Sequence, residues 1–356
     1  MGSCAAIANR RTGRARRAPA LGPQVANPPH TSGTLLVGEA LVLLPSNSSR
    51  ILAVRLGAMG DIIHTLPAVA ALKRKYAGAH VTWVVEPQWA ALLEENPYVD
   101  RVVLLRRGSA AGLLKSWREL RERCYDLAVD FQGLLKSAVV TAAARPSRAL
   151  GFATPLLRER AAALFYTDRV AARGAHMVDR NCELTGCADA PREFPLPAGR
   201  ADGELPEGRF VLASPLAGWR AKQWPEEHYS VLARRLRREL NVPLVLIGRE
   251  AAHLPAMEDA IPHVSGLPGL IYATRRAAAV VGVDSGPLHI AAALGKPGVA
   301  IFGPTDPARN GPYGGSLRVL RGKGALTTYK RADEIDESMR RITPGEVFED
   351  LRVALA

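Results

Sequence analysis

The stretch RLGAMGDIIHTLP, residues 55–67, places one carboxylate in a turn that contains two glycines. The residues before it, ILAV at 51–54, form the short apolar run that is typical of a strand covered on both faces. Gly57 and Gly60 allow backbone angles and close ligand approach that a side chain would block. Apolar residues then recur at helical spacing, so the pattern predicts strand, turn and helix, with Asp61 near the helix start.

A second stretch repeats this order far along the chain. AVVGVDSGPLHIAAAL, residues 279–294, runs from an apolar strand through Asp284 into a small-residue turn and a helix. Free N–H groups in such a turn, together with the helix dipole, form a ready phosphate site. Because ligands bind at the carboxyl ends of parallel strands, the two stretches predict a cleft with one acidic turn on each side. A simple helix cap remains the alternative for Asp61.

Apolar strands alternate with helices from residue 50 onward, interrupted by a Pro- and Gly-rich linker at 191–208. This alternation predicts an α/β protein with two doubly wound parallel sheets. Near the C-terminus, Thr343 is a plausible cap for a helix over 344–355. The predicted divisions are a disordered basic extension at 1–49, a first domain at 50–200, a second at 208–330 and a helical tail at 331–356.

Composition allows a globular protein with an anionic partner. The 356 residues are 47% hydrophobic and carry a net charge of +13. The net positive charge favours an anionic partner, which could be nucleic acid, a phosphorylated lipid surface or a nucleotide-bearing substrate. Nucleic-acid binding is the least favoured, because aromatic residues make up only 6% and no recognition motif is present.

Cysteine spacing and hydropathy indicate the compartment in which the protein is expected. Four scattered cysteines lack metal-ligand spacing and fit a reducing cytoplasm better than a zinc protein. The best apolar run, residues 34–45, is too short to span a membrane and contains Glu39. No signal peptide is indicated, and the arginine-rich start is expected to be disordered.

Six motifs, in this order, resemble the lipopolysaccharide heptosyltransferases of glycosyltransferase family 9, and among them the type I enzymes. They are LGAMGDIIHTLPA at 56–68, DFQGLLKSA at 130–138, RERAAALFY at 158–166, KQWPEEHY at 222–229, DSGPLHIAAALGKP at 284–297 and FGPTDPARNGPYG at 302–314. The resemblance implies the GT-B fold, two Rossmann-like domains facing a cleft, with the acceptor in the first domain and the nucleotide sugar in the second. The sequence departs from the family pattern at two places. It has Asp-Ser-Gly instead of the more usual Asp-Thr-Gly at 284–286, and it lacks a short Ser/Thr-bearing segment after Gly266.

The implied reaction is inverting transfer of heptose from ADP-heptose to Kdo of lipid A, with no metal or other cofactor. Such chemistry needs a base on the acceptor hydroxyl and cationic stabilisation of the departing diphosphate. By resemblance Asp61 is the base and Lys222 contacts the diphosphate, although a solvated surface lysine is the alternative for Lys222. The implied donor-binding residues are Gly60, Glu250, Asp284, Ser285, Gly286, His289 and Thr305. The alternatives are an ordinary exposed glutamate for Glu250, helix packing for His289 and a plain turn for Thr305.

Acceptor recognition calls for cations in the first domain, because the acceptor is an anionic amphiphile. Lys136, Arg145 and Arg158 are the candidates by position, and each could equally be a solvated charge. We expect a cytoplasmic protein held peripherally at the inner face of the cytoplasmic membrane. The alternatives are another family 9 transferase with a different donor or acceptor, such as a heptosyltransferase II, and a basic nucleic-acid-binding protein.

Overall fold

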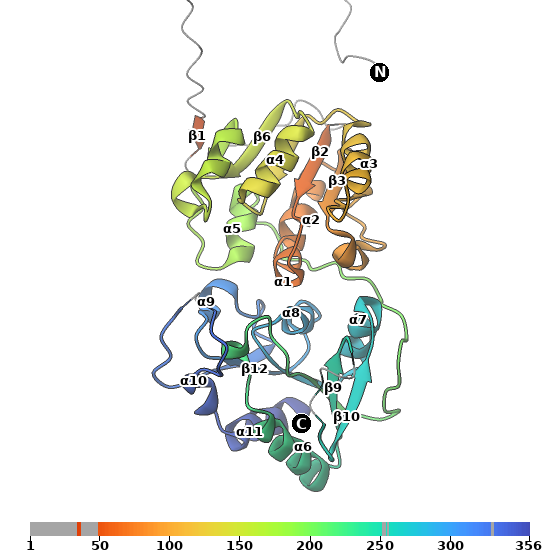
Figure 1. Ribbon diagram of the computed structural model, residues 1–356, viewed down its shortest axis with the longest axis vertical. Coiled ribbons are helices and arrows are strands. Elements are labelled where there is room, and N and C mark those ends of the chain that lie inside the picture. Colours follow the sequence, from red (N-terminus) through yellow and green to blue (C-terminus); the bar gives the residue numbers. More distant parts are fainter. Residues whose placement is uncertain (1–33, 37–48, 251–253, 255, 329–330) are drawn as a thin grey trace, which may run out of the picture.

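The computed structural model describes residues 34–36, 49–250, 254, 256–328 and 331–356. Nearly all of the predicted extension at 1–49 lies outside the described residues. Two lobes are stacked along the longest axis, the N-terminal lobe in red to green and the C-terminal lobe in green to blue (Figure 1).

The N-terminal lobe is built on a seven-stranded sheet of order β1-β7-β6-β5-β2-β3-β4 in which all pairings are parallel. Central strand β2 sends Ile51 and Ala53 into one core cluster and Leu52 and Val54 into another. Both faces are therefore buried, which explains its uninterrupted apolar sequence. The strands are β1 (Thr34–Leu36), β2 (Arg50–Val54), β3 (His80–Val85), β4 (Arg101–Leu104), β5 (Leu127–Asp130), β6 (Arg148–Phe152) and β7 (Asp168–Val170).

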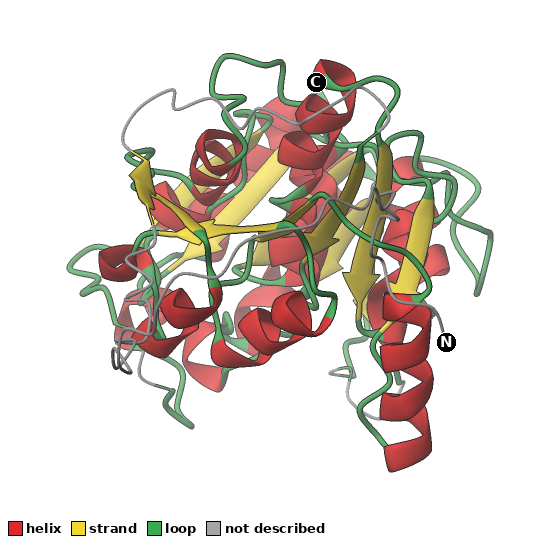
Figure 2. Ribbon diagram, turned by 90° about the horizontal axis from the view of Figure 1, so that it is seen from above, coloured by secondary structure: helices red, strands yellow, loops and turns green. Residues whose placement is uncertain are grey.

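Helices cover both faces of this sheet (Figure 2). Helix α2 packs against α5, and α3 packs against α4. The elements are α1 (Met59–Ile63), α2 (Leu66–Lys75), α3 (Ala110–Arg121), α4 (Leu135–Ala143), α5 (Met177–Leu184) and the 3-10 helices η1 (Pro87–Leu93), η2 (Thr154–Leu156) and η3 (Arg160–Phe165).

The C-terminal lobe has a six-stranded parallel sheet of order β10-β9-β8-β11-β12-β13. Its strands are β8 (Val211–Ser214), β9 (Leu244–Gly248), β10 (Ala260–Val264), β11 (Ala279–Val283), β12 (Gly298–Phe302) and β13 (Leu317–Arg321). Its helices are η4 (Arg220–Lys222), α6 (Glu226–Leu240), α7 (Leu267–Arg276), α8 (Gly286–Ala293), α9 (Pro307–Asn310), α10 (Glu337–Arg340) and α11 (Pro344–Leu355). The α/β class and the two facing sheets agree with the prediction.

The C-terminal segment begins its last helix as predicted. Thr343 Oγ1 accepts a hydrogen bond from the backbone N–H of Glu346, whose carboxylate accepts from the N–H of Thr343 at 2.8 Å. Helix α11 packs on α6 and β12, so this end of the chain belongs to the core of the C-terminal lobe.

Several predicted elements differ from the structure. The single helix expected after the Asp61 turn is two helices, because Pro67 has no N–H to continue the hydrogen-bond ladder beyond α1. The helix between β3 and β4 is a 3-10 helix, η1. Helices α4, α5, α9 and α10 and strands β6, β7, β10 and β13 were not predicted. Strand β1 was not predicted either, and it lies within the extension that was expected to be disordered. Pro262 obscured β10, which tolerates proline because it is an edge strand.

The two lobes meet closely where α1 packs against α8. A Cβ at Gly60 would lie 2.4 Å from His289 Cδ2, and one at Gly286 would lie 2.5 Å from Met59 Sδ. Ile290 and Ile63 belong to one core cluster that crosses the boundary. Each acidic turn therefore supplies a glycine whose missing side chain lets the opposite lobe approach.

Candidate active site

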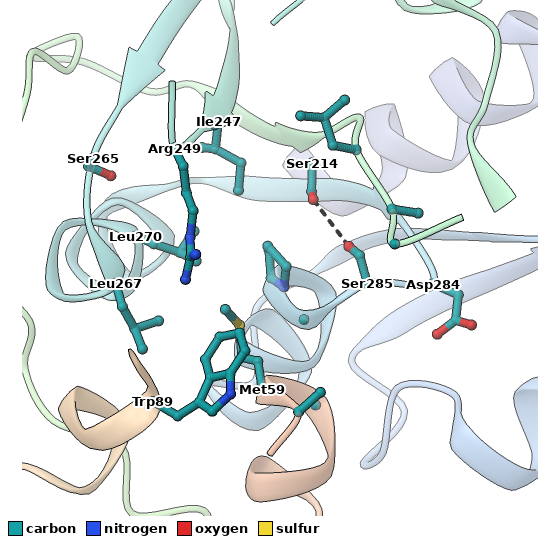
Figure 3. A pocket seen from close by; sticks show the side chains of 18 of the residues that line it. Met59, Trp89, Ser214, Ile247, Arg249, Ser265, Leu267, Leu270, Asp284 and Ser285 are labelled. Carbon is teal, nitrogen blue, oxygen red and sulfur yellow. Dashed lines mark hydrogen bonds between the residues drawn. The ribbon is translucent and has the colours of Figure 1, made fainter. Parts of the chain in front are cut away.

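A cavity of about 560 Å³ lies between the lobes. Met59 and Trp89 enter it from the N-terminal lobe, and the ends of β8 and β9 and the starts of α7 and α8 form the other side (Figure 3). The carboxyl ends of parallel strands thus face this cavity, as predicted for ligand binding in an α/β protein. The predicted residues among its lining are Gly60, Lys222, Asp284, Ser285 and Gly286.

The start of α8 presents backbone donors to the cavity. Ser285 is the N-cap residue, and its Oγ lies 3.2 Å from Ser214 Oγ (Figure 3). Pro287 occupies the first turn without wasting a donor. Free N–H groups and the positive end of the helix dipole make this a suitable place for an anion.

Lys222 and Asp284 form an ion pair beside that helix start. Lys222 Nζ lies 2.9 Å from Asp284 Oδ2, and both side chains are mostly buried. The ammonium also lies 4.9 Å from the centroid of the Trp219 ring. Burial raises the pKa of Asp284, but the His289 imidazole and the Lys222 charge outweigh it and lower this pKa below its usual range. Asp284 therefore stays ionised and fixes the ammonium at the cavity wall.

Asp61 has a different environment on the opposite lobe. Its side chain is 45% exposed, and Oδ2 lies 2.5 Å from Arg55 Nη2. Arg55 is buried and donates from Nη1 to the carbonyl oxygen of Phe131 at 2.6 Å. The guanidinium therefore fixes one carboxylate oxygen. Within the described part of the chain, Oδ1 makes no hydrogen bond to protein.

Comparison with known proteins decides the family. The family model for glycosyltransferase family 9 (heptosyltransferase) matches residues 113–337. The chain is 35% identical over 298 residues to lipopolysaccharide heptosyltransferase 1 of Pseudomonas aeruginosa, covering 75% of this chain and 82% of that relative. The chain belongs to glycosyltransferase family 9.

Type 2 enzymes are also similar to this family 9 protein. It is 28% identical over 343 residues to lipopolysaccharide heptosyltransferase 2 of Salmonella typhimurium, covering 84% of this chain and 96% of the relative. The structure of E. coli heptosyltransferase WaaC with ADP matches at a TM-score of 0.70 and 25% identity, covering 86% of this chain and 99% of that one. The same enzyme with ADP-2-deoxy-2-fluoro heptose also matches at 0.70. These similarities confirm the GT-B-like fold and a transferase activity.

The family motif DFQG supports the Asp61 loop. Asp130 is fully buried and accepts hydrogen bonds from Ser137 Oγ and the Tyr166 hydroxyl, both at 2.8 Å. Gln132 Oε1 accepts from the N–H of Leu56 at 2.9 Å. This motif thus holds the strand end from which the Asp61 turn departs.

The far end of the cavity is more apolar and includes residues that the sequence did not single out. Ile247, Leu267 and Leu270 line it, opposite Trp89 (Figure 3). Arg249 crosses this end, with its guanidinium carbon 5.6 Å from the Trp89 ring centroid. An apolar slot closed by an aromatic ring and a cation suits a flat heteroaromatic ring.

Three of the predicted donor contacts do not line the cavity. His289 is buried. Its ring centroid lies 4.5 Å from that of His64, and its Nε2 lies 3.8 Å from Asp284 Oδ1. It therefore packs the seam between the lobes. Thr305 is buried, and Glu250 is exposed beside cavity-lining Arg249.

The three predicted acceptor contacts lie at two different edges of the N-terminal sheet. Lys136, at the start of α4, lies 3.7 Å from Glu86 Oε1. Arg158 is exposed in the loop that follows β6, so both lie at the carboxyl edge that faces the cleft. Arg145 follows α4 and precedes β6, which places it at the opposite edge, away from the cavity.

The described residues contain neither a candidate metal-ligand cluster nor a helix that could span a membrane. No group of three or more His, Cys, Asp or Glu in this part could hold a metal ion. No helix in the same part is long and apolar enough to cross a bilayer.

Proposed function

We propose that this protein transfers heptose from ADP-heptose to Kdo of a lipid A-borne acceptor, with inversion and with Asp61 as the general base. The relatives named above support the donor and the acceptor class. The reaction would take place at the inner face of the cytoplasmic membrane, where the protein binds peripherally and needs no metal.

One geometric observation carries the proposal. Asp61 is a half-exposed carboxylate that directly follows cavity-lining Gly60, whereas Lys222 and the start of α8 line the cavity from the other lobe. A base and an anion site are thus supplied from opposite sides of one cleft. Inverting transfer requires this arrangement, because the acceptor attacks the face of the sugar opposite to the leaving group.

Asp61 would take the proton of the acceptor hydroxyl as its oxygen bonds to the anomeric carbon. The bond from that carbon to the diphosphate oxygen breaks at the same time, and its electron pair leaves with ADP. Arg55 holds Oδ2, so Oδ1 is the oxygen placed to accept the proton. General-base catalysis of this kind contributes about 10²–10⁴-fold.

The departing diphosphate would meet Lys222 and the free N–H groups of Ser285 and Gly286. Both groups stabilise the negative charge that grows on the leaving group. The adenine would enter the apolar end between Trp89 and Leu270.

A second acceptor deserves a parallel test, because type 2 heptosyltransferases match over nearly their whole length. The purified chain is incubated with ADP-heptose and either Kdo2-lipid A or the same acceptor already carrying one heptose, and products are weighed by mass spectrometry. We expect one heptose to be added to Kdo2-lipid A. Addition only to the heptosylated acceptor would replace the proposed specificity, and no addition to either would overturn the function.

A further inference from the structure

Exposed large apolar side chains of the N-terminal lobe gather on three elements. Among the described residues of this lobe, all of them lie on α3, α4 or η3. They are Leu113 (46% exposed), Leu114 (50%), Trp117 (44%), Leu135 (43%), Val139 (48%) and Leu164 (86%). Gathering of this kind marks an interaction site, because scattered exposure is the normal pattern.

Helix α3 exposes three of its four large apolar side chains. The residues that it buries are Ser116 and Leu120, and Ser116 Oγ donates to the carbonyl oxygen of Leu104 at 2.8 Å. Trp117 and the two leucines point outward instead. Helix α6 of the C-terminal lobe has the ordinary arrangement, since it buries Tyr229, Leu232, Ala233 and Leu236.

The three elements form one continuous surface. Arg121 Nε donates to the carbonyl oxygen of Ala143 at 3.0 Å, which joins the ends of α3 and α4. Helix α4 packs against η3, and the N–H of Leu135 donates to Glu159 Oε2 at 2.6 Å. Both helices lie in the upper lobe of Figure 1.

Basic side chains surround these apolar groups. Lys115, Arg118, Arg158 and Arg160 are exposed, and Lys136 is 41% exposed. The Arg121 guanidinium carbon lies 4.3 Å from the Trp117 ring centroid.

The acidic groups of the same elements are engaged with other partners. Glu119 bonds to Arg106 at 3.1 Å and also lies 4.0 Å from Lys115 Nζ, Glu122 pairs with Arg101, and Glu159 accepts from the backbone of α4. The charge that remains exposed around Trp117 is therefore mainly positive.

We propose that this surface, made of α3, α4 and η3, docks the protein onto an anionic phospholipid bilayer. Leucine and tryptophan side chains enter the boundary between headgroups and acyl chains, while lysine and arginine meet the phosphates. The inference deepens the proposed function, because Lys136 and Arg158 lie where this surface reaches the cleft. An acceptor held in the same bilayer would then present its sugars to that edge.

Vesicle flotation tests the proposal with the full-length chain. We expect binding to vesicles of phosphatidylcholine with phosphatidylglycerol, weak binding to phosphatidylcholine alone, and release by salt. Lys115→Gln with Arg118→Gln should lower partitioning by on the order of tenfold or more, since each basic residue contributes about fivefold. Leu114→Ser with Trp117→Ser should lower it at least as much.

A matched control makes the same change of charge on α6. Arg237→Gln with Arg238→Gln removes two exposed basic side chains from the other lobe, and should bind vesicles as the native chain does. All variants should keep the native melting temperature. Equal loss in the α6 variant would show that total charge, and not this surface, determines binding, and would overturn the proposal.

Direct insertion can be read from Trp117. Brominated phosphatidylglycerol should quench native fluorescence more strongly than that of Trp117→Phe. Equal quenching, or unchanged vesicle binding by both α3 variants, would contradict the proposal. So would a native dimer in sedimentation that Leu114→Ser with Trp117→Ser abolishes, because a second copy would then cover the surface.

The transfer assay separates the two proposals. With an acceptor stripped of its acyl chains, the α3 variants should be as active as the native chain, and with acceptor in vesicles they should be slower. If the native chain transfers no heptose yet binds vesicles through α3, the proposed function fails and the docking surface stands.

Discussion

The two acidic turns have the same local sequence pattern and opposite environments. Asp61 and Asp284 each come after a buried parallel strand. Asp61 lies in the first turn of α1 beside Gly60, and Asp284 lies just before α8, which begins at Gly286. Asp61 is 45% exposed and is held by Arg55, six residues away in the same motif. Asp284 is 13% exposed and is paired with Lys222, which comes from a distant 3-10 helix.

The difference shows that the partner, and not the turn, determines what each carboxylate can do. Asp284 is enclosed by Lys222 and His289, so its charge is committed to holding an ammonium at the cavity wall. Asp61 is half-exposed and only its Oδ2 is bound by Arg55, so its charge remains available to a ligand.

Asp61→Asn should have the largest effect on catalysis. The amide keeps the shape of the side chain but cannot accept the proton, so we expect kcat to fall by about 10²–10⁴-fold. Initial rates at saturating donor and acceptor measure this. The melting temperature should fall less than in the Asp284 variant, because water screens the 45% exposed Asp61 side chain and the amide oxygen can still accept from the buried Arg55 guanidinium. A native rate in this variant would remove Asp61 from its assigned role.

Asp284→Asn should have the opposite balance of effects and should mainly lower the stability of the fold. It leaves the mostly buried Lys222 ammonium without its counter-charge, so we expect a loss of about 3 kcal/mol in the free energy of unfolding. Urea denaturation measures this change. The double variant Asp284→Asn with Lys222→Met should recover part of the stability but bind the donor poorly. Equal destabilisation by Asp61→Asn would show that the two turns do not differ.

The strand-turn-helix units could be predicted because their information is local. A continuous apolar run, a small-residue turn and helical spacing lie within 279–294, and β11 and α8 follow this pattern closely. The region from 135 to 184 was harder, since strand β7 has only three residues and helix α4 buries mainly small residues such as Ser137 and Ala138.

Contacts between the lobes could not be predicted, because they join residues that are remote in sequence. The approach of Arg249 to Trp89 and of His289 to Gly60 depends on how two sheets stack. The position of Arg145 depends on similar information, because the sequence does not show that α4 places it at the opposite edge of the sheet from the cleft.

Gly60 and Gly286, the glycines at the contact between the lobes, should have a smaller effect on stability. Gly60→Ala would bring its Cβ to 2.4 Å from the buried His289 ring, and Gly286→Ala would bring its Cβ to 2.5 Å from Met59 Sδ. A ring packed in the seam yields less than a flexible thioether. We therefore expect Gly60→Ala to cost about 1–3 kcal/mol of stability and Gly286→Ala less, by urea denaturation. The reverse order would show that the Asp284 side of the seam is the more rigid.

The smallest expected effect concerns the pH dependence of this seam. Burial, followed by the charges of His289, His176 and Arg55, lowers the pKa of His64 well below its usual value. The folded state then binds fewer protons on His64 than the unfolded state, so stability falls as pH drops below about 6.5. Burial lowers the pKa of His176 in the same direction.

The pH dependence of the unfolding free energy distinguishes the histidines of the α1–α8 contact from the carboxylates of the acidic turns. In urea denaturation between pH 7 and 5, His64→Leu should reduce the loss of unfolding free energy by at most about 1.4 kcal/mol per pH unit. Asp284 adds its own acid sensitivity only near and below about pH 4, where the carboxylate of the unfolded chain takes up its proton. If His64→Leu kept the native slope, proton uptake in this range would belong to groups outside the α1–α8 contact, and the seam would join the lobes without sensing pH.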